Sequence, residues 1–141
     1  EAPGRFEEIE GKPFVGSAGK LLNNALESAG IGRKHVYITN IVLWRPPNNR
    51  KPLKHEVETC SPFLVEQIRI VKPGVVCTLG NTPLNFFIKG KKIGDVHGKS
   101  VKTTIDGFPI TLFPTFHPAA ILYNKKLQKF FEGDIKKLAN F

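Results

Sequence analysis

Apolar residues along this chain fall into two patterns, short continuous runs and helical stripes. The continuous runs are rich in β-branched residues and predict strands at residues 36–43 and 75–79. Two more apolar runs, residues 101–105 and 108–113, flank an Asp-Gly pair and predict a hairpin. We therefore expect strands in both the first and the second half of the chain.

Helical spacing fills the intervals between these runs. One helical stripe of apolar residues begins after Ser17, which fits an N-cap, and ends before Gly30, which fits a helix end. Ser61 and Pro62 predict an interruption, with a second helix starting there. The predicted helices cover residues 17–29, 54–60 and 61–71, a short segment ending at 88, and a last segment from 123 or 124 to 138. Alternating strands and helices favour an α/β fold, a three-layer α/β/α sandwich with a mainly parallel central sheet.

The composition and charge indicate which kinds of partner this chain binds. The 141 residues fit a single domain over 1–141, and 40% of them are hydrophobic, which is typical of a globular chain. A net charge of +9 favours an anionic partner, nucleic acid before an anionic membrane. No apolar run has membrane-spanning length and no signal peptide is visible, so we expect no membrane partner. Two cysteines without secretory features suggest reduced thiols and a cytoplasmic location.

One histidine stands where chemistry is expected. His117 follows the apolar run 108–113, and Pro118 ends the strand because it has no N–H to donate. Polar groups at the carboxyl ends of strands in α/β sheets face the crevice where ligands bind. The alternative is a histidine that only caps a turn.

Four motifs occur in a fixed order along nearly the whole chain. They are EAPG…GKPFVGSAGKLL, TNIVLWRPPNNRKP, C-x-x-FL-x-x-QI-x-x-x-KP-x-VV-x-x-LG and PTFHPAAIL. Together they resemble a family 4 uracil-DNA glycosylase. The resemblance implies a DNA glycosylase that hydrolyses the N-glycosidic bond of a flipped-out uracil to start base-excision repair. It also implies a monomer that acts on single- or double-stranded uracil-containing DNA.

The resemblance assigns three residues to the base. Phe14 matches the aromatic that stacks on uracil, Asn40 the amide that reads its pairing edge, and His117 the donor to its O2 atom. Each has a structural alternative: Phe14 as a staple under the next helix, Asn40 as a turn residue, His117 as a cap.

The same resemblance assigns the first residues of the chain to the pocket. Glu1 or Glu7 would orient the attacking water, with Glu7 preferred because a terminal residue frays; either is otherwise an ordinary solvated acid. The backbone expected to line the pocket belongs to Ala2, Pro3 and Gly4.

Two segments are expected to hold DNA. A stiff basic loop suits phosphates, and the residues after the histidine are expected to enter the duplex, with Ile121 and Leu122 as an apolar wedge. Tyr123 stands where the family commonly has arginine. The expected DNA contacts are Arg45, Asn49, Arg50, Lys51, Pro118, Ala119, Ala120, Ile121 and Leu122.

Two departures from the family are visible. The family usually holds an iron–sulfur cluster with four cysteines, but only Cys60 matches a ligand, Trp44 replaces another, and Cys77 matches none. We therefore expect no cluster and no other cofactor. The apolar strand that precedes the Glu-Ala-Pro-Gly turn in the family is also missing upstream of residue 1, so 36–43 and 75–79 are expected to flank a vacancy. Alternatives are a non-catalytic nucleic-acid-binding relative or an incomplete fragment.

Overall fold

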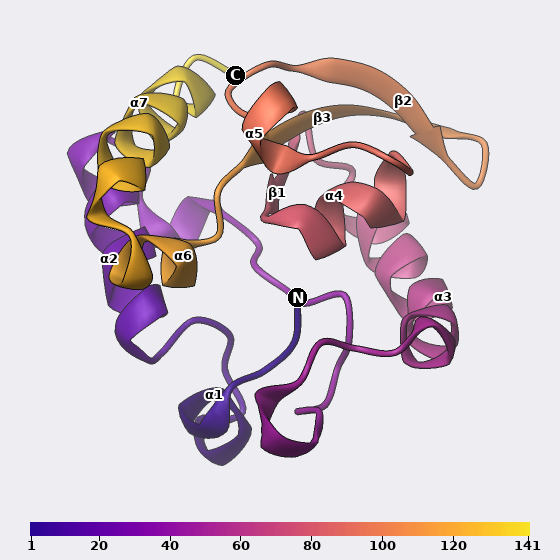
Figure 1. The fold of residues 1–141 in the computed structure, drawn as a ribbon. Coiled ribbons are helices and arrows are strands. Elements are labelled where there is room, and N and C mark those ends of the chain that lie inside the picture. Colours follow the sequence, from indigo (N-terminus) through magenta and orange to yellow (C-terminus); the bar gives the residue numbers. More distant parts are fainter.

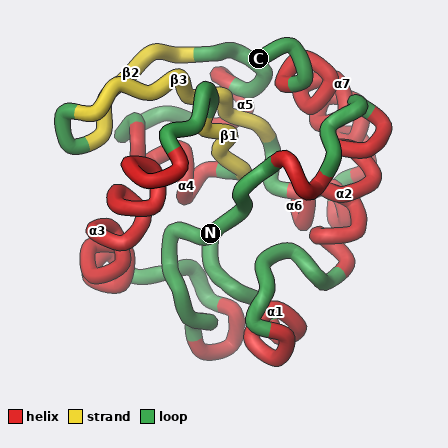
Figure 2. Tube along the Cα trace, turned by 180° about the vertical axis from the view of Figure 1, so that it is seen from behind, coloured by secondary structure: helices red, strands yellow, loops and turns green.

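The computed structural model describes all 141 residues, with a small sheet between two groups of helices (Figure 1). Helices α2, α6 and α7 lie together on one side and α3 and α4 on the other, which the view from behind also shows (Figure 2). The helices are α1 (Arg5–Glu10), α2 (Ser17–Ser28), α3 (Lys54–Val71), α4 (Asn81–Phe87), α5 (Ile93–Val96), α6 (Pro118–Tyr123) and α7 (Gln128–Leu138). Short 3-10 turns lie at Arg33–His35, Pro47–Asn49 and Lys125–Leu127.

The sheet has three strands in the order β1-β3-β2, namely β1 (Val76–Leu79), β2 (Val101–Ile105) and β3 (Phe108–Thr115). β1 runs parallel to β3, whereas β2 and β3 form the predicted hairpin. Its turn uses positive φ at both Asp106 (48°) and Gly107 (75°), as tight hairpin turns require. The α/β class is confirmed, although this sheet is mixed rather than mainly parallel.

The core follows the predicted apolar stripes. In α2 the buried residues Leu22, Ala25 and Leu26 recur at helical spacing and face the rest of the molecule. Strand β3 is buried along its second half, from Leu112 to Phe116 at its end. The predicted helix 17–29 and strand 75–79 are therefore confirmed to within one residue at their ends.

Helix α3 is continuous through Pro62, so the predicted interruption is wrong. A proline inside a helix leaves the carbonyl four residues earlier without its usual donor. Here the Ser61 hydroxyl donates to the Glu58 carbonyl at 2.9 Å and supplies that bond. Ser61, which suggested the start of a new helix, instead supplies the hydrogen bond that Pro62 cannot donate.

Residues 36–43 are not a strand, contrary to the prediction. The segment pairs with no strand, and the Val42 N–H donates instead to the Glu1 carbonyl at 3.0 Å. Strand β1 bonds to β3 alone, so its other edge is unpaired. A cavity of about 530 Å³ is lined by both 35–41 and 73–79. The segment 36–43 therefore has no strand beside it to bond and borders this cavity instead.

Three short helices were not predicted, and the last helix starts later than expected. The Asn124 side chain accepts a bond from the Lys126 N–H, which makes a separate turn before α7 begins at Gln128. The helices α1, α5 and α6 have six residues or fewer, too short for a periodic signal. No helix combines the length and apolar character that crossing a membrane demands.

Candidate active site

His117 lies two residues after the end of β3 and is the N-cap of α6. Its Nδ1 accepts a hydrogen bond from the Ala119 N–H at 3.1 Å, and Pro118 occupies the first helical position. The histidine therefore does cap a helix, as its structural alternative proposed. The cap uses one ring nitrogen and leaves Nε2 free for a ligand.

The protonation of His117 follows from its surroundings. Burial lowers the pKa of the imidazole from 6.5 to about 4, because a charged ring loses its hydration there. The ring is therefore neutral near pH 7. Since Nδ1 accepts a bond, the single proton lies on Nε2, and the free nitrogen is a donor.

Phe14 packs against this histidine. The two ring centroids are 5.7 Å apart with an interplanar angle of 32°. Phe14 has φ +55°, an unfavourable value for an aromatic residue, so its loop must be held by its neighbours. A Cβ on Gly19 would come within 1.9 Å of the Phe14 carbonyl oxygen, so the glycine allows this close approach.

Glu7 anchors the loop that carries Phe14. Its Oε1 accepts the N–H groups of Val15 and Gly16, both at 3.1 Å. The nearby Gly4 has no space for a side chain, because a Cβ there would lie 2.7 Å from Glu7 Oε2. Glu7 therefore fixes the loop with one oxygen, a role that the sequence reading missed and that no periodic pattern would reveal.

Glu1, Phe14 and Asn40 line the same cavity although they are far apart in sequence. The Thr82 hydroxyl donates to the Glu1 carboxylate and orients it. The structure thus brings together Glu1, Phe14, Asn40 and, through the Phe14 ring, His117. Residues Ala2, Pro3 and Gly4 are half-buried beside this group. Thr82 is a further contact that the sequence did not indicate.

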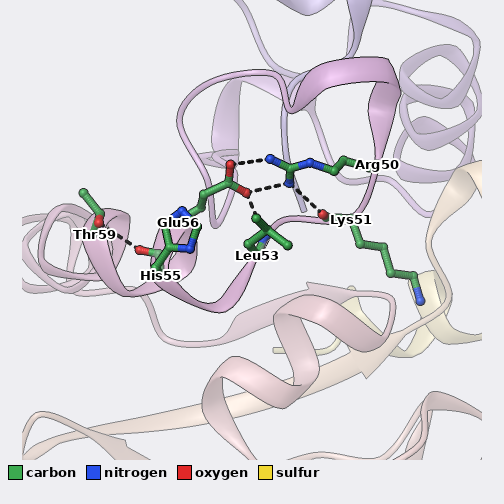
Figure 3. A network of polar contacts seen from close by, with 6 residues as sticks. All are labelled: Arg50, Lys51, Leu53, His55, Glu56 and Thr59. Carbon is green, nitrogen blue, oxygen red and sulfur yellow. Dashed lines mark hydrogen bonds and ion pairs between the residues drawn. The ribbon is translucent and has the colours of Figure 1, made fainter.

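The basic loop is held by internal contacts. Arg45 donates to Asn49 Oδ1 at 2.8 Å and lies 3.4 Å from a Glu8 carboxylate oxygen. The Arg50 guanidinium binds both oxygens of Glu56, at 2.9 and 2.7 Å (Figure 3). Of the four predicted phosphate contacts in this loop, Lys51 is exposed, and its side chain points away from Arg50 and Glu56 (Figure 3).

Glu56 also caps α3. Its Oε2 accepts the Leu53 N–H at 2.7 Å, at the first turn of the helix. The bond from Arg50 and then the backbone N–H lower the pKa of Glu56 from 4.5 to about 2. The Arg50 charge is therefore balanced inside the loop, which leaves it less available to a phosphate.

Helix α6 presents only its far end to solvent. Pro118 and Ile121 are buried in the core, whereas Leu122 is 43% and Tyr123 92% exposed. Ala119 and Ala120 are half-buried. Ile121 cannot reach a duplex from its place in the core, so any wedge on this helix consists of Leu122 and Tyr123.

The cysteines do not fit a four-cysteine cluster. Cys60 is buried, and its sulfur accepts the Leu43 N–H at 3.5 Å. Cys77 lies in β1, where burial raises the pKa of its thiol to about 12, opposite to what a metal-binding thiolate needs. No three His, Cys, Asp or Glu side chains lie close enough to hold a metal ion together.

Comparisons with known proteins show the family of this chain. The sequence model of the uracil DNA glycosylase superfamily matches residues 1–139. The chain is 46% identical to the Type-4 uracil-DNA glycosylase of Saccharolobus solfataricus, over 98% of this chain and 67% of that protein. It is 42% identical to the Type-4 enzymes of Archaeoglobus fulgidus, with 98% and 72% covered, and of Thermotoga maritima, with 100% and 74% covered.

Proposed function

The chain belongs to the type-4 family of the uracil-DNA glycosylase superfamily, and on this premise we propose that it removes uracil from DNA. The reaction is hydrolysis of the N-glycosidic bond, which leaves an abasic site and starts base-excision repair. The observation that supports this proposal most is that Phe14 and Asn40 line one cavity and that the neutral His117 ring packs against Phe14.

Binding begins with a uracil that has left the base stack. Extrusion costs a few kcal/mol, which the pocket must offset. Stacking on the Phe14 ring contributes about 1–3 kcal/mol on the scale of base–aromatic contacts. The Asn40 amide has both a donor and an acceptor, which matches O4 and N3–H of uracil and mismatches cytosine.

Bond cleavage leaves negative charge on the uracil. We propose that the Nε2–H of His117 donates to O2 as this charge develops, which lowers the barrier without a proton transfer. The capping bond at Nδ1 supports this role, because it fixes the ring orientation and the tautomer before substrate arrives.

Water is the nucleophile, and we propose Glu1 as the residue that orients it. Glu7 is the other candidate, but its Oε1 already accepts two backbone N–H groups in the Phe14 loop. Glu1 lines the cavity with Asn40, and a hydroxyl donor orients its carboxylate. The geometry therefore favours Glu1 over the residue preferred from sequence.

We propose that these steps need no cofactor, because every group in the proposed mechanism belongs to the protein itself. The two cysteines do not fit the four-cysteine cluster of the family. We propose that the protein works as a monomer on single- or double-stranded DNA in the cytoplasm. Its net charge of +9 supports an encounter with a polyanion.

The test is a glycosylase assay with defined oligonucleotides. Strands with one uracil, single-stranded or paired with G or A, are incubated with the protein, and abasic sites are cleaved by alkali. We expect cleavage at uracil and none in the matched thymine strand. His117→Ala, purified identically, controls for a contaminating glycosylase. Binding without any abasic product would replace the proposal with a non-catalytic nucleic-acid-binding protein.

A further inference from the structure

A buried polar cluster lies behind His117 and takes no part in the proposed reaction. Asp134 of α7 is 2% exposed, and Thr115 at the end of β3 is fully buried. The Thr115 hydroxyl donates to Asp134 Oδ2 at 2.7 Å. His97, after α5, places its Nδ1 2.8 Å from the same oxygen. Residues from three separate parts of the chain therefore meet at the Asp134 carboxylate. One of them, Thr115, lies two residues before His117.

The residue between Thr115 and His117 is held from the same side. The Phe116 ring lies against the His97 ring, with centroids 4.6 Å apart, and Phe130 of α7 packs on His97 at 5.5 Å. His97 thus contacts Asp134 through a ring nitrogen and packs its ring against that of Phe116. The end of β3 is fixed at two successive residues.

The backbone around the cluster is shaped to admit the Asp134 carboxylate and to hold the end of β3. Gly98 has φ +67°, and its N–H donates to the Pro114 carbonyl at 2.8 Å. A Cβ on Gly98 would lie 2.2 Å from Asp134 Oδ1, so only glycine lets the carboxylate come this close. On the other side, the Gly80 N–H donates to the Thr115 carbonyl at 2.8 Å, so β3 is held from both sides.

We infer that Asp134, His97 and Thr115 form a clamp that positions His117, an inference that rests on the proposed glycosylase function. A catalytic donor must sit within a fraction of an ångström of the atom where charge develops, and a 1 Å error can cost about a hundredfold in rate. His117 itself is held by the α6 cap, by the Phe14 ring and by Gly80, which lies close to its Cβ. The clamp adds a constraint on the backbone two residues earlier, and its members are positioning residues without contact to substrate.

Two threonines of β3 offer a matched test. Thr115→Val removes the hydroxyl of the clamp and keeps the shape of the side chain. Thr111 is half-buried on the same strand, does not line the cavity and is not a partner of Asp134, so Thr111→Val makes the same substitution without touching the clamp. We expect Thr115→Val to lower the single-turnover rate roughly tenfold to a hundredfold, with unchanged affinity for uracil-containing DNA. Thr111→Val should keep the wild-type rate, and Thr115→Ser, which keeps the hydroxyl, should recover most of it.

A second measurement is independent of activity. Nitrogen-15 NMR of the histidine side chains in the free protein reports the His117 ring environment. Thr115→Val should shift the His117 signals and Thr111→Val should leave them in place. If the wild type removes no uracil, the proposed function fails while these signals still decide whether the clamp holds the ring. Unchanged rate and signals in folded Thr115→Val, or equal slowing in both valine variants, would overturn the inference. If Thr115→Val does not fold, Asp134→Asn is used instead. It should slow the single-turnover reaction and shift the His117 signals in the same way, and an unchanged rate with unchanged signals would overturn the inference.

Discussion

His117 serves two purposes with two ring nitrogens, and substitutions can separate them. His117→Ser keeps an N-cap side chain but has no donor at the Nε2 position, whereas His117→Ala loses both. Both variants should lose roughly a hundredfold or more in single-turnover rate. Only the alanine variant should also lose about 1 kcal/mol of stability from the missing cap. A serine variant with the wild-type rate would mean that His117 is only a cap.

The same residue makes stability depend on pH. Above pH 6.5 the ring is neutral in both states, so it has no effect. Between pH 6.5 and about 4 the unfolded chain binds the proton and the folded protein does not, so stability falls as pH is lowered. The full loss amounts to about 3 kcal/mol. Urea unfolding at pH 7, 6 and 5 should show this decline, and His117→Ser should show much less of it.

The two candidate acids can be told apart by amide substitutions. Glu7→Gln retains a carbonyl oxygen that can accept the N–H groups of Val15 and Gly16, so the rate should change little. Glu1→Gln removes the charge proposed to orient water, and the rate should fall roughly a hundredfold, the low end for a lost general base. Single-turnover assays on both variants decide the assignment, and the opposite ranking would return the role to Glu7.

At the scale of residues, the sequence suggests candidate residues but not their contacts. The motifs singled out Phe14, Asn40 and His117; in the structure Phe14 and Asn40 line one cavity, and Phe14 packs against His117. They could not reveal that Glu7 anchors the Phe14 loop or that Ile121 is buried, because both depend on the direction of a side chain in the folded chain. The clamp around Asp134 joins residues 37 and 19 positions apart, beyond any local pattern.

At the scale of elements, the start of α3 depends on one carboxylate. Glu56 joins the Arg50 guanidinium to the Leu53 N–H, whereas Glu58 makes only an exposed pair with Lys54 at 3.7 Å. Glu56→Gln should therefore lower the melting temperature by a few degrees and speed hydrogen exchange in the first turn of α3. Glu58→Gln is the matched control and should change neither, because exposed pairs contribute little. Equal effects in the two variants would contradict the capping role.

Elements with local signals were predicted well, and those that depend on partners were not. The α2 stripe and the Asp106-Gly107 hairpin carry their own patterns and were found. The run at 36–43 has strand composition but no strand beside it to bond, so its pattern could not decide its structure. Helix α3 continues through Pro62 with the help of the Ser61 hydroxyl, a local side-chain bond that outweighs the usual stop signal.

At the scale of the whole molecule, the charge predicts how DNA binding responds to salt. If four phosphates are neutralised on duplex DNA, log K against log salt should have a slope of about −3.6. Lys51→Ala should make the slope shallower by about 0.9, because its side chain is exposed. Fluorescence anisotropy between 50 and 300 mM salt, roughly the range where phosphate contacts dominate, measures both slopes. A slope near zero would mean that the +9 charge serves something other than DNA.

The open edge of β1 has a consequence for handling the protein. Unpaired N–H and C=O groups beside apolar side chains are the features by which strands of different molecules add to one another. Such addition is bimolecular, so its rate rises with protein concentration and its products accumulate on storage. Protein concentration and sample age are therefore experimental variables for this chain. Rates should be measured on dilute, fresh samples, so that association through the edge of β1 does not lower the apparent activity.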